Sequence, residues 1–177
     1  MGESSGLRIE PMNRNHRPLL KDFRNQHESL TRYLQRFALR HQKRDLLSKT
    51  YVAIDRVENA ERIAGYFSLA ATSVTRESVR PIKGLERLPR FPLPSVLLTR
   101  MAIDERVQGQ GLGRYLLEEA LARTLELAQT GILGIRLFVT DAIDESAARF
   151  YQKFGFLRLG DRYPCRMVLD LRGLIEP

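Results

Sequence analysis

The chain has 177 residues, of which 43% are hydrophobic, and this is enough to build the core of one globular domain. Its 29 Lys and Arg residues against 21 Asp and Glu residues give a net charge of +8, which a small-metabolite enzyme does not need and a polyanion binder would use. A single cysteine excludes an internal disulfide, and three scattered histidines predict no metal site. There is no apolar run of about 18 residues and no signal-peptide pattern, so we expect a cytoplasmic protein without a membrane span.

The first part of the chain predicts a short strand, two helices and a hairpin. Alternating apolar residues mark the strands, and apolar residues three and four apart mark the helices. The expected elements are strand 7–10, helices 18–23 and 28–40, and strands 50–55 and 63–71 joined across residues 57–60.

Two groups of basic residues stand out in this half of the chain. The second helix has an apolar face that includes Tyr33 and Phe37, and its cations recur three and four residues apart on another face. These cations are Arg32, Arg36, Arg40, Lys43 and Arg44. A second cluster lies in the proline-rich, irregular connection 73–93 and consists of Arg76, Arg80, Lys83, Arg87 and Arg90. Such a stripe is either a polyanion-binding surface or an ordinary solvated face.

A glycine-rich loop follows the apolar strand 95–103 and precedes an amphipathic helix at 111–129. Its sequence, residues 106–113, is Arg-Val-Gln-Gly-Gln-Gly-Leu-Gly. Glycine lets the backbone approach a ligand closely, and the free N–H groups of a helix N-terminus attract a phosphate. The loop lacks the Lys-Ser/Thr of a Walker P-loop and the spacing G-x-G-x-x-G, so it predicts a phosphorylated cofactor of another kind, or a simple turn that caps the helix.

A further strand, a helix and two closing strands complete the expected fold. The strand is the apolar run 132–140, the helix is 144–154 with Asp144 as its N-cap and Gly155 just beyond its end, and the closing strands are 156–159 and 166–171. The strand–helix–strand order in the middle requires a parallel pair with a right-handed crossover. We therefore expect an α/β (α+β) fold in one domain over residues 1–177. Its single mixed sheet would be mostly antiparallel, with a central parallel pair and helices on both faces.

Four segments of the sequence resemble the motifs of a known protein family. The loop resembles the pyrophosphate loop R/Q-x-x-G-x-G/A of the GNAT acetyltransferases, which bind acetyl-CoA, and residues 147–156 resemble the family ending A-x-x-x-Y-x-K-x-G-F. The segments AGYFSLA at 64–70 and RMAID at 100–104 are similar to the GNAT toxins of toxin–antitoxin pairs, of the TacT and AtaT type. This likeness runs roughly from Tyr33 to Leu171. One departure is Asp144, where many relatives have Asn; it puts a side-chain contact to pantetheine in doubt, but not the fold.

The resemblance implies an acetyl-CoA-dependent enzyme of the GNAT fold that acetylates the α-amino group of aminoacyl-tRNA and stops translation. Tyr151 would be the general acid; the other interpretation is a core aromatic with a satisfied hydroxyl. The implied cofactor-binding residues are Met101, Ala102, Ile103, Arg106, Val107, Gln108, Gly109, Gln110, Gly111, Leu112 and Gly113. The tRNA-binding residues would be Arg32, Arg36, Arg40, Lys43, Arg44, Arg90 and Arg100. Expected partners are aminoacyl-tRNA, a ribbon–helix–helix antitoxin and a second copy of the chain.

The strand before the loop carries no general base, since Val96–Ile103 contains neither an acid nor a histidine. Without a base, the neutral form of a lysine amine with pKa about 10.4 costs about 4.6 kcal/mol at pH 7, and that of an α-amine with pKa about 7.7 costs about 1 kcal/mol. This difference predicts an acceptor with a low-pKa amine, as in aminoacyl-tRNA.

Arg100 has two interpretations: it contacts the tRNA or a substrate phosphate, or it forms a buried salt bridge with Asp104 or Glu105. Three classes of function stay open at this point. They are the acetyltransferase toxin, a GNAT enzyme that acts on a protein N-terminus or a small amine, and a non-catalytic basic RNA- or partner-binding protein that retains the fold.

Overall fold

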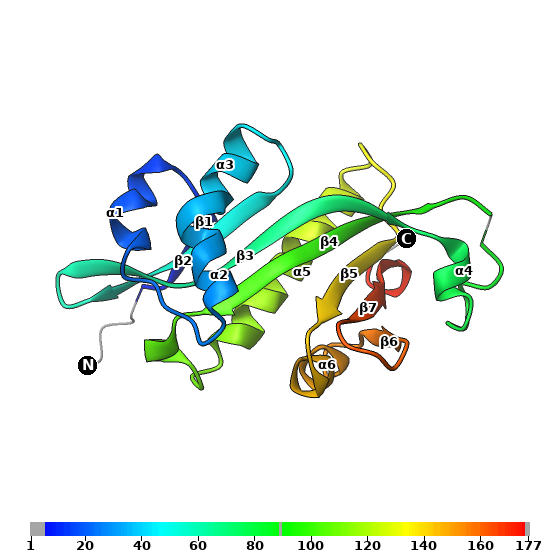
Figure 1. Cartoon of the computed structure of the whole chain (residues 1–177). Coiled ribbons are helices and arrows are strands. Elements are labelled where there is room, and N and C mark those ends of the chain that lie inside the picture. Colours follow the sequence, from blue (N-terminus) through cyan, green and yellow to red (C-terminus); the bar gives the residue numbers. More distant parts are fainter. Residues whose placement is uncertain (1–5, 89, 176–177) are drawn as a thin grey trace. The chain divides into compact units, whose positions relative to one another are not determined.

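The computed structural model describes residues 6–88 and 90–175, and its helices and strands are labelled in Figure 1. The N-terminal elements are β1 (Arg8–Pro11), the 3-10 helix η1 (Arg14–His16), α1 (Arg17–Leu20), α2 (Glu28–Arg32), the π-helical turn η2 (Tyr33–Phe37), α3 (Ala38–Lys43), β2 (Lys49–Val57) and β3 (Ala60–Val74). The remaining elements are α4 (Arg76–Val79), β4 (Leu93–Ile103), the 3-10 helix η3 (Glu105–Val107), α5 (Leu112–Gln129), β5 (Leu137–Ala142), α6 (Glu145–Gln152), β6 (Leu157–Leu159), β7 (Cys165–Asp170) and the 3-10 helix η4 (Leu171–Gly173).

The strands form one mixed sheet in the order β1-β2-β3-β4-β5-β7-β6. The pairs β1–β2, β2–β3, β5–β7 and β6–β7 are antiparallel, while β4 and β5 are parallel and joined through α5. This confirms the predicted mixed, mostly antiparallel sheet with a central parallel pair. Within the described residues every helix is too short or too polar to cross a membrane.

The chain forms two compact units. Among the described residues, the first consists of those up to Ala70 together with Thr99–Ala120, and the second consists of those between Ala71 and Leu98 together with those from Leu121 onward. The elements β3, β4 and α5 each contribute residues to both units.

In the first unit, helices pack on both faces of the strands. Tyr66 and Val52 project from the strands into a core with Tyr33 and Leu34 of the α2–η2–α3 helix, and the hydroxyl of Tyr66 donates to the carbonyl of Leu30 at 2.8 Å. Adjacent residues of a strand point to opposite faces, so Gly65 faces the other way, toward α5. A Cβ at Gly65 would lie 2.8 Å from Leu116 Cδ1, so glycine is what allows α5 to approach β3 this closely.

The second helix begins where the sequence predicts but is not a regular α-helix. Residues 33–37 form a π-helical turn, and the N–H of Ala38 bonds to the carbonyl of Tyr33, five residues back. A π turn inserts an extra residue and so breaks the constant angular spacing of side chains along the helix. Side chains that are three and four apart in sequence therefore do not have to form one stripe.

In the second unit, two expectations are wrong at their boundaries. The connection 73–93 is not simply irregular, because β3 continues to Val74 and α4 follows it. Val79 of α4 and Leu85, which lies after α4, are fully buried in a core with residues of β5 and β7. The strand predicted at 132–140 begins only at Leu137, and Ile132 is 79% exposed. Gly131 has φ +70°, a turn conformation that ends α5 and keeps the apolar residues after it out of the sheet.

Candidate functional site

The glycine-rich loop has the backbone conformation that a phosphate cradle needs. Gly109 and Gly111 have φ of +78° and +81°, a region that disfavours every residue with a Cβ, and a Cβ at either position would meet nothing within 4 Å. The described residues offer no hydrogen-bond acceptor to the backbone N–H groups of residues 112–114, the first turn of α5. Open space and free N–H groups at the positive end of an 18-residue helix fit the pyrophosphate of a nucleotide cofactor.

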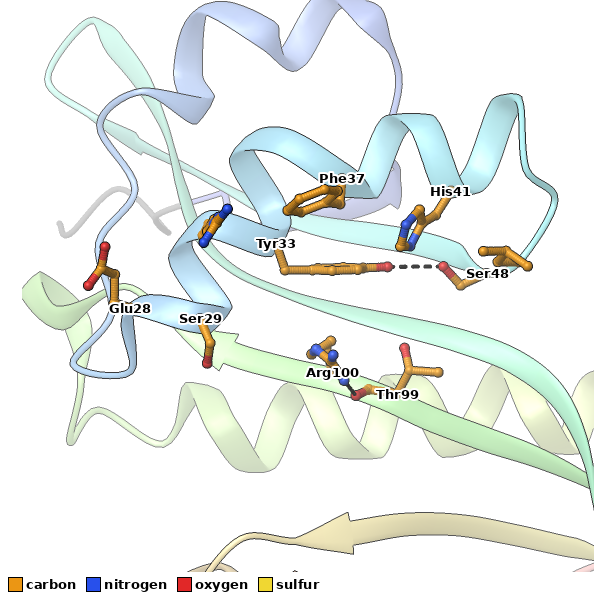
Figure 2. Close-up of a pocket in the computed structure, with 10 residues that line it drawn as sticks. Glu28, Ser29, Tyr33, Phe37, His41, Ser48, Thr99 and Arg100 are labelled. Atoms are coloured by element: carbon orange, nitrogen blue, oxygen red, sulfur yellow. Dashed lines mark hydrogen bonds between the residues drawn. The ribbon is translucent and has the colours of Figure 1, made fainter.

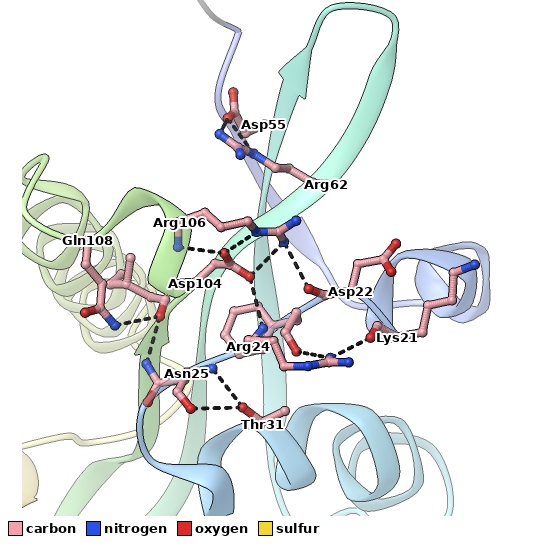
Figure 3. Close-up of polar contacts among 12 residues, drawn as sticks. Lys21, Asp22, Arg24, Asn25, Thr31, Asp55, Arg62, Asp104, Arg106 and Gln108 are labelled. Carbon is pink, nitrogen blue, oxygen red and sulfur yellow. Dashed lines mark hydrogen bonds and ion pairs between the residues drawn. The ribbon is translucent and has the colours of Figure 1, made fainter.

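Arg106, which the resemblance assigns to the same pyrophosphate, is already engaged by the protein (Figure 3). Its Nε and Nη2 donate to the Asp104 carboxylate at 2.6 and 2.9 Å, and Nη2 also donates to the carbonyl of Asp22 at 3.0 Å. The buried carboxylate further accepts the backbone N–H of Arg24 at 3.0 Å. In this geometry the side chain of Arg106 joins the end of β4 to the segment after α1, and the backbone N–H groups are what remain for an anion.

Asp104 is poorly suited to act as a base. Burial tends to raise the pKa of its carboxyl group, but the hydrogen bonds from the Arg106 guanidinium and from two backbone N–H groups outweigh burial, and the pKa lies below its ordinary value. A carboxylate with a depressed pKa and its oxygens occupied takes up a proton only weakly.

The strand predicted to hold the thioester, Met101 to Ile103, ends β4. In the described residues the parallel ladder with β5 stops at Leu98, so these three residues lie beyond it. Ala102 is buried in the core of the first unit, and the Ile103 carbonyl accepts from Asn25 Nδ2 at 2.8 Å and from Gln108 Nε2 at 3.4 Å. The carbonyl of Ile103 is therefore occupied by the protein itself.

A cavity of about 700 Å³ lies between the α2–η2–α3 helix and β4 (Figure 2). We call it the aromatic pocket; it is lined by Glu28, Ser29, Arg32, Tyr33, Phe37, His41, Leu47, Ser48, Thr99 and Arg100. The guanidinium of Arg100 lies 5.3 Å from the centre of the Tyr33 ring, and the Tyr33 hydroxyl is 3.0 Å from Ser48 Oγ. Sequence reasoning missed Glu28 and His41, two groups that could accept a proton here, because neither lies on the strand that was searched for a base.

The structure corrects the second interpretation of Arg100. Arg100 is exposed and reaches over Tyr33, a cation–π contact, and its Nη1 donates to the carbonyl of Thr99 at 2.7 Å. Asp104 is paired with Arg106 instead. The interpretation of Arg100 as a member of a buried salt bridge is therefore wrong, because its side chain is exposed.

The predicted basic stripe is divided between two surfaces. Arg32 lines the aromatic pocket, 6.0 Å from the Phe37 ring centre. The other four cations line a second concavity of about 620 Å³, which we call the basic hollow, and three cations from η1, α1 and the residue after α1 join them there. The basic hollow is lined by Arg14, Arg17, Leu20, Lys21, Gln35, Arg36, Leu39, Arg40, Lys43 and Arg44. The spacing of Arg14, Arg17 and Lys21, three and then four residues apart, was the signal that could have revealed them.

Tyr151 belongs to the second unit, where both predicted helix caps of α6 are present. Asp144 accepts the N–H of Ala147 at 2.8 Å, and Gly155 with φ +84° ends the helix in a Schellman motif, in which the N–H of Phe156 bonds to the carbonyl of Tyr151. Tyr151 is buried beside Phe156, with ring centres 5.5 Å apart. Burial raises the pKa of its phenol, although a hydrogen bond with Thr140 opposes the change. Arg90, the remaining predicted tRNA contact, is exposed in this unit.

Comparisons with known proteins agree on the family. Residues 47–158 match the model of the acetyltransferase (GNAT) domain. A tRNA-acetylating toxin of Mycobacterium tuberculosis (strain ATCC 25618 / H37Rv) is 33% identical over 117 residues, which cover 64% of this chain and 68% of the relative. The chain therefore belongs to the GNAT acetyltransferase family.

Solved structures share the fold at lower identity. AtaT complexed with acetyl-methionyl-tRNAfMet superposes with a TM-score of 0.83 at 24% identity, covering 95% of this chain and 96% of AtaT. A mutant AtaT toxin bound to the C-terminus of the antitoxin AtaR and acetyl-CoA superposes with a TM-score of 0.74 at 22% identity, covering 95% of each chain.

Proposed function

We propose that this protein transfers the acetyl group of acetyl-CoA to the α-amino group of aminoacyl-tRNA and thereby blocks translation. The observation that carries the proposal is the lack of a free base where the acyl donor would lie. The described β4 strand has no acid or histidine between Val96 and Ile103, and Asp104 at its end is held by Arg106 with a lowered pKa. A strand built this way gives no help in removing a proton from the amine, so it favours an amine that is already partly neutral, and an α-amine costs about 3 to 4 kcal/mol less to deprotonate than lysine does. Glu28 and His41, which line the aromatic pocket, lie on α2 and α3 and not on this strand.

In this proposal the donor is held by the backbone. The N–H groups of the glycine-rich loop, residues 106–113, and of the first turn of α5 bind the pyrophosphate, and Met101 to Ile103 lie along the pantetheine and thioester. The side chain of Arg106 contributes indirectly, because it fixes the loop to Asp104 and to the carbonyl of Asp22. Acetyl-CoA supplies the activated acetyl group.

Tyr151 is the proposed general acid. The acceptor nitrogen attacks the thioester carbonyl carbon, the C–S bond breaks, and the CoA thiolate takes the phenolic proton while the acceptor nitrogen loses a proton to water. A raised pKa keeps the phenol protonated at neutral pH, so the proton is available to be donated. The same shift makes the phenol a weaker acid, so the transfer depends on a thiolate whose basicity is also raised by its desolvated surroundings.

The acceptor side of the proposal rests on the aromatic pocket. Thr99 and Arg100 line it and immediately precede Met101, so the pocket opens on the strand proposed to hold the thioester. A guanidinium above a tyrosine ring suits the end of an RNA chain, where bases stack and phosphates pair with arginine. The activity named for the mycobacterial relative supports the same acceptor.

The biological setting follows from this substrate. We place the protein in the cytoplasm, as one catalytic domain, with an antitoxin of the ribbon–helix–helix type as its inhibitor and a second copy of the chain as its partner in a homodimer. The antitoxin-bound AtaT structure, which has the same fold, supports an antitoxin partner.

The test combines labelled acetyl-CoA with a pool of charged tRNAs and compares the wild type with Tyr151→Phe. We expect label on the aminoacyl group, and a rate reduced by roughly 10²-fold or more in the variant, the usual contribution of a general acid. Tyr115→Phe, which removes a hydroxyl from a tyrosine that is 39% exposed, is the matched control and should retain the rate. Acetyl-CoA binding without label on any charged tRNA would refute the proposal.

One further acceptor class is favoured by the same observation, because a protein N-terminus also offers an α-amine of low pKa, as does a small amine that carries an electron-withdrawing group beside its nitrogen. Neither of them needs the exposed cations of the first unit. Transfer to tRNA should therefore weaken steeply with added salt, whereas transfer to a small amine should not. A non-catalytic RNA binder would show no turnover for Tyr151→Phe to abolish.

A further inference from the structure

Thr140 carries a buried hydroxyl that packing alone does not require. It lies on β5 and is 3% exposed, and a valine of nearly the same shape would fill the same space. A buried hydroxyl costs free energy unless it is hydrogen-bonded, and Thr140 Oγ1 donates to the carbonyl of Leu98 on β4 at 3.1 Å. Because Leu98 and Thr140 form the last pair of the described parallel ladder, the hydroxyl bonds β4 where the pairing of the two strands ends.

The face of β5 that carries Thr140 is also the face that meets Tyr151. Alternate residues of a strand share a face, so Thr140 lies beside Phe138 and Ala142. The ring centre of Phe138 lies 5.7 Å from that of Phe156, which lies 5.5 Å from that of Tyr151, and all of these residues are buried. Of the three residues on this face of β5, Thr140 alone has a side chain that hydrogen-bonds, and its second partner is the hydroxyl of Tyr151.

The single proton of the Thr140 hydroxyl can serve only one of these two partners at a time. While this proton is donated to the Leu98 carbonyl, the threonine oxygen can accept the phenolic O–H of Tyr151. When the phenol has lost its proton, the Thr140 hydroxyl can turn and donate to the phenolate. A hydrogen bond to a charged group is roughly twice as strong as a neutral one, so this contact stabilises the ionised phenol more than the neutral phenol.

The other surroundings of the phenol act in the opposite sense. Burial raises the pKa of Tyr151 most, the bond with Thr140 lowers it, and the carboxylate of Asp141 raises it. Asp141 is itself paired with Arg166, whose Nε lies 2.6 Å from Oδ1. Of the three influences, only the bond with Thr140 eases the loss of the phenolic proton. The remaining titratable side chains of α6 and β7 stay unchanged in every variant used below: Glu145, Arg149, Cys165, Arg166 and Asp170.

We propose that Thr140 is a positioning residue for the acetyl transfer, which holds the phenol of Tyr151 in place and then bonds the phenolate once the proton has gone to the CoA thiolate. The inference rests on the proposed function, in which Tyr151 is the general acid. No proton passes between the two hydroxyls. The Thr140 proton shifts its hydrogen bond from the Leu98 carbonyl to the phenolate, and it shifts back when a proton from water restores the phenol.

The first test compares Thr140→Val with Thr140→Ser in the transfer of label from acetyl-CoA to a pool of charged tRNAs. We expect Thr140→Val to lower kcat by about 10- to 100-fold, the usual contribution of a hydrogen bond to a charged group. The KM for acetyl-CoA should not change, because Thr140 is buried. Thr140→Ser keeps the hydroxyl and should stay close to the wild-type rate. A wild-type kcat in Thr140→Val, or a serine variant as slow as the valine variant, would overturn the proposal.

A double variant shows whether Thr140 acts through Tyr151. Residues that act as a unit are strongly non-additive, so Thr140→Val should slow the wild type but should not slow Tyr151→Phe any further. Equal slowing in both backgrounds would mean that Thr140 supports only the fold, and the proposal would be wrong. The matched control is Thr50→Val in the first unit, which removes another buried threonine hydroxyl, 2.7 Å from Ser68 Oγ, and should keep the wild-type kcat.

A titration of Tyr151 tests the contact without any turnover. Fluorotyrosine in place of Tyr151 is followed by fluorine NMR as the pH is raised, since fluorine lowers the pKa of a phenol and brings its ionisation into a range where the protein is folded. We expect the pKa of this phenol to be higher in Thr140→Val than in the wild type, and Thr140→Ser to restore the wild-type value. The same pKa in Thr140→Val and in the wild type would contradict the proposal.

Two further provisions keep the tests decisive. If Thr140→Val does not fold, Thr140→Cys takes its place in each comparison, because a thiol of similar size is only a weak hydrogen-bond donor. If the wild type transfers no label to charged tRNA, or if Tyr151→Phe keeps the wild-type rate, the proposed function fails. The fluorine titration then decides by itself whether Thr140 bonds the phenolate of Tyr151.

Discussion

The contact between Arg106 and Asp104 decides whether Arg106 serves the fold or the ligand, and Arg106→Gln separates the two roles. Removing one partner of a buried ion pair costs roughly 3–5 kcal/mol, because the other charge is left without compensation. Here Asp104 is fully buried, but the side chain of Arg106 is 44% exposed, so water can partly replace the guanidinium. Two backbone N–H groups also continue to bond the carboxylate. We therefore expect Arg106→Gln to lower the free energy of unfolding by about 2–3 kcal/mol.

Urea unfolding at pH 7 measures this effect in a double-mutant cycle of Arg106→Gln and Asp104→Asn. The interaction energy between the two sites should be about 2 kcal/mol, since contacting charged residues are strongly non-additive. The matched control is Arg114→Gln. Arg114 forms a similarly short ion pair with Glu118, at 2.7 Å against 2.6 Å for Arg106 with Asp104, but the side chains of Arg114 and Glu118 are 74% and 47% exposed. An exposed pair of this kind should contribute less than about 0.5 kcal/mol.

The dissociation constant of acetyl-CoA tests the other role of Arg106, direct binding of the ligand. If Arg106 acts through the fold, Arg106→Gln should change this constant by less than about threefold at temperatures where the variant is folded, because a threefold change is about 0.7 kcal/mol. A variant of normal stability that binds acetyl-CoA tenfold more weakly or worse would refute this reasoning. It would mean that the guanidinium leaves Asp104 and holds the pyrophosphate, as the family resemblance implies.

Three further results are expected. Gly65→Ala should destabilise the protein by about 1–3 kcal/mol in urea unfolding, because its Cβ would lie 2.8 Å from Leu116 Cδ1 and 3.0 Å from the carbonyl oxygen of Ala102; unchanged stability would contradict this packing. The depressed pKa of Asp104 contributes stability above the unfolded pKa of about 3.9, which is lost as the pH falls through the lower folded value, so Asp104→Asn should flatten the acid limb of unfolding. Because the pKa of Tyr151 is raised, ultraviolet titration should show its phenol still protonated at about pH 10; ionisation near pH 8 would contradict the burial argument.

The sequence alone determined the features that short-range physics controls. The Asp144 cap and the end of α6 at Gly155 depend on a few neighbouring residues, and both lie where the sequence predicts. The positive φ at Gly109 and Gly111 is likewise local, because it needs only a residue without a Cβ. The parallel pairing of β4 and β5 follows from the helix predicted between the two strands, because a crossover through a helix joins parallel strands. The spacing of residues within two motifs was also enough to identify the family, because the glycine-rich loop and the α6 segment with Tyr151 are each short and continuous in the sequence.

The tertiary structure decided what depends on distant residues meeting. The π turn at 33–37 separates Arg32 from the cations that follow it, and only packing of α1 beside η2 brings Arg14, Arg17 and Lys21 to the same hollow. Hydrophobicity alone made residues 132–136 resemble a strand, although the turn at Gly131 leaves them outside the sheet.

The pairing of Asp104 with Arg106 shows the same division within one motif. The sequence places Arg106 correctly at the start of the glycine-rich loop, but it carries no sign that the segment after α1 binds both members of the pair. The Arg24 N–H and the Asp22 carbonyl are 80 and 84 residues along the chain from the groups they bond, so the role of Arg106 is set by the folded neighbours and not by the loop. Local sequence fixes the conformation of a segment, whereas the chemistry of a charged side chain depends on which distant partner the fold brings to it.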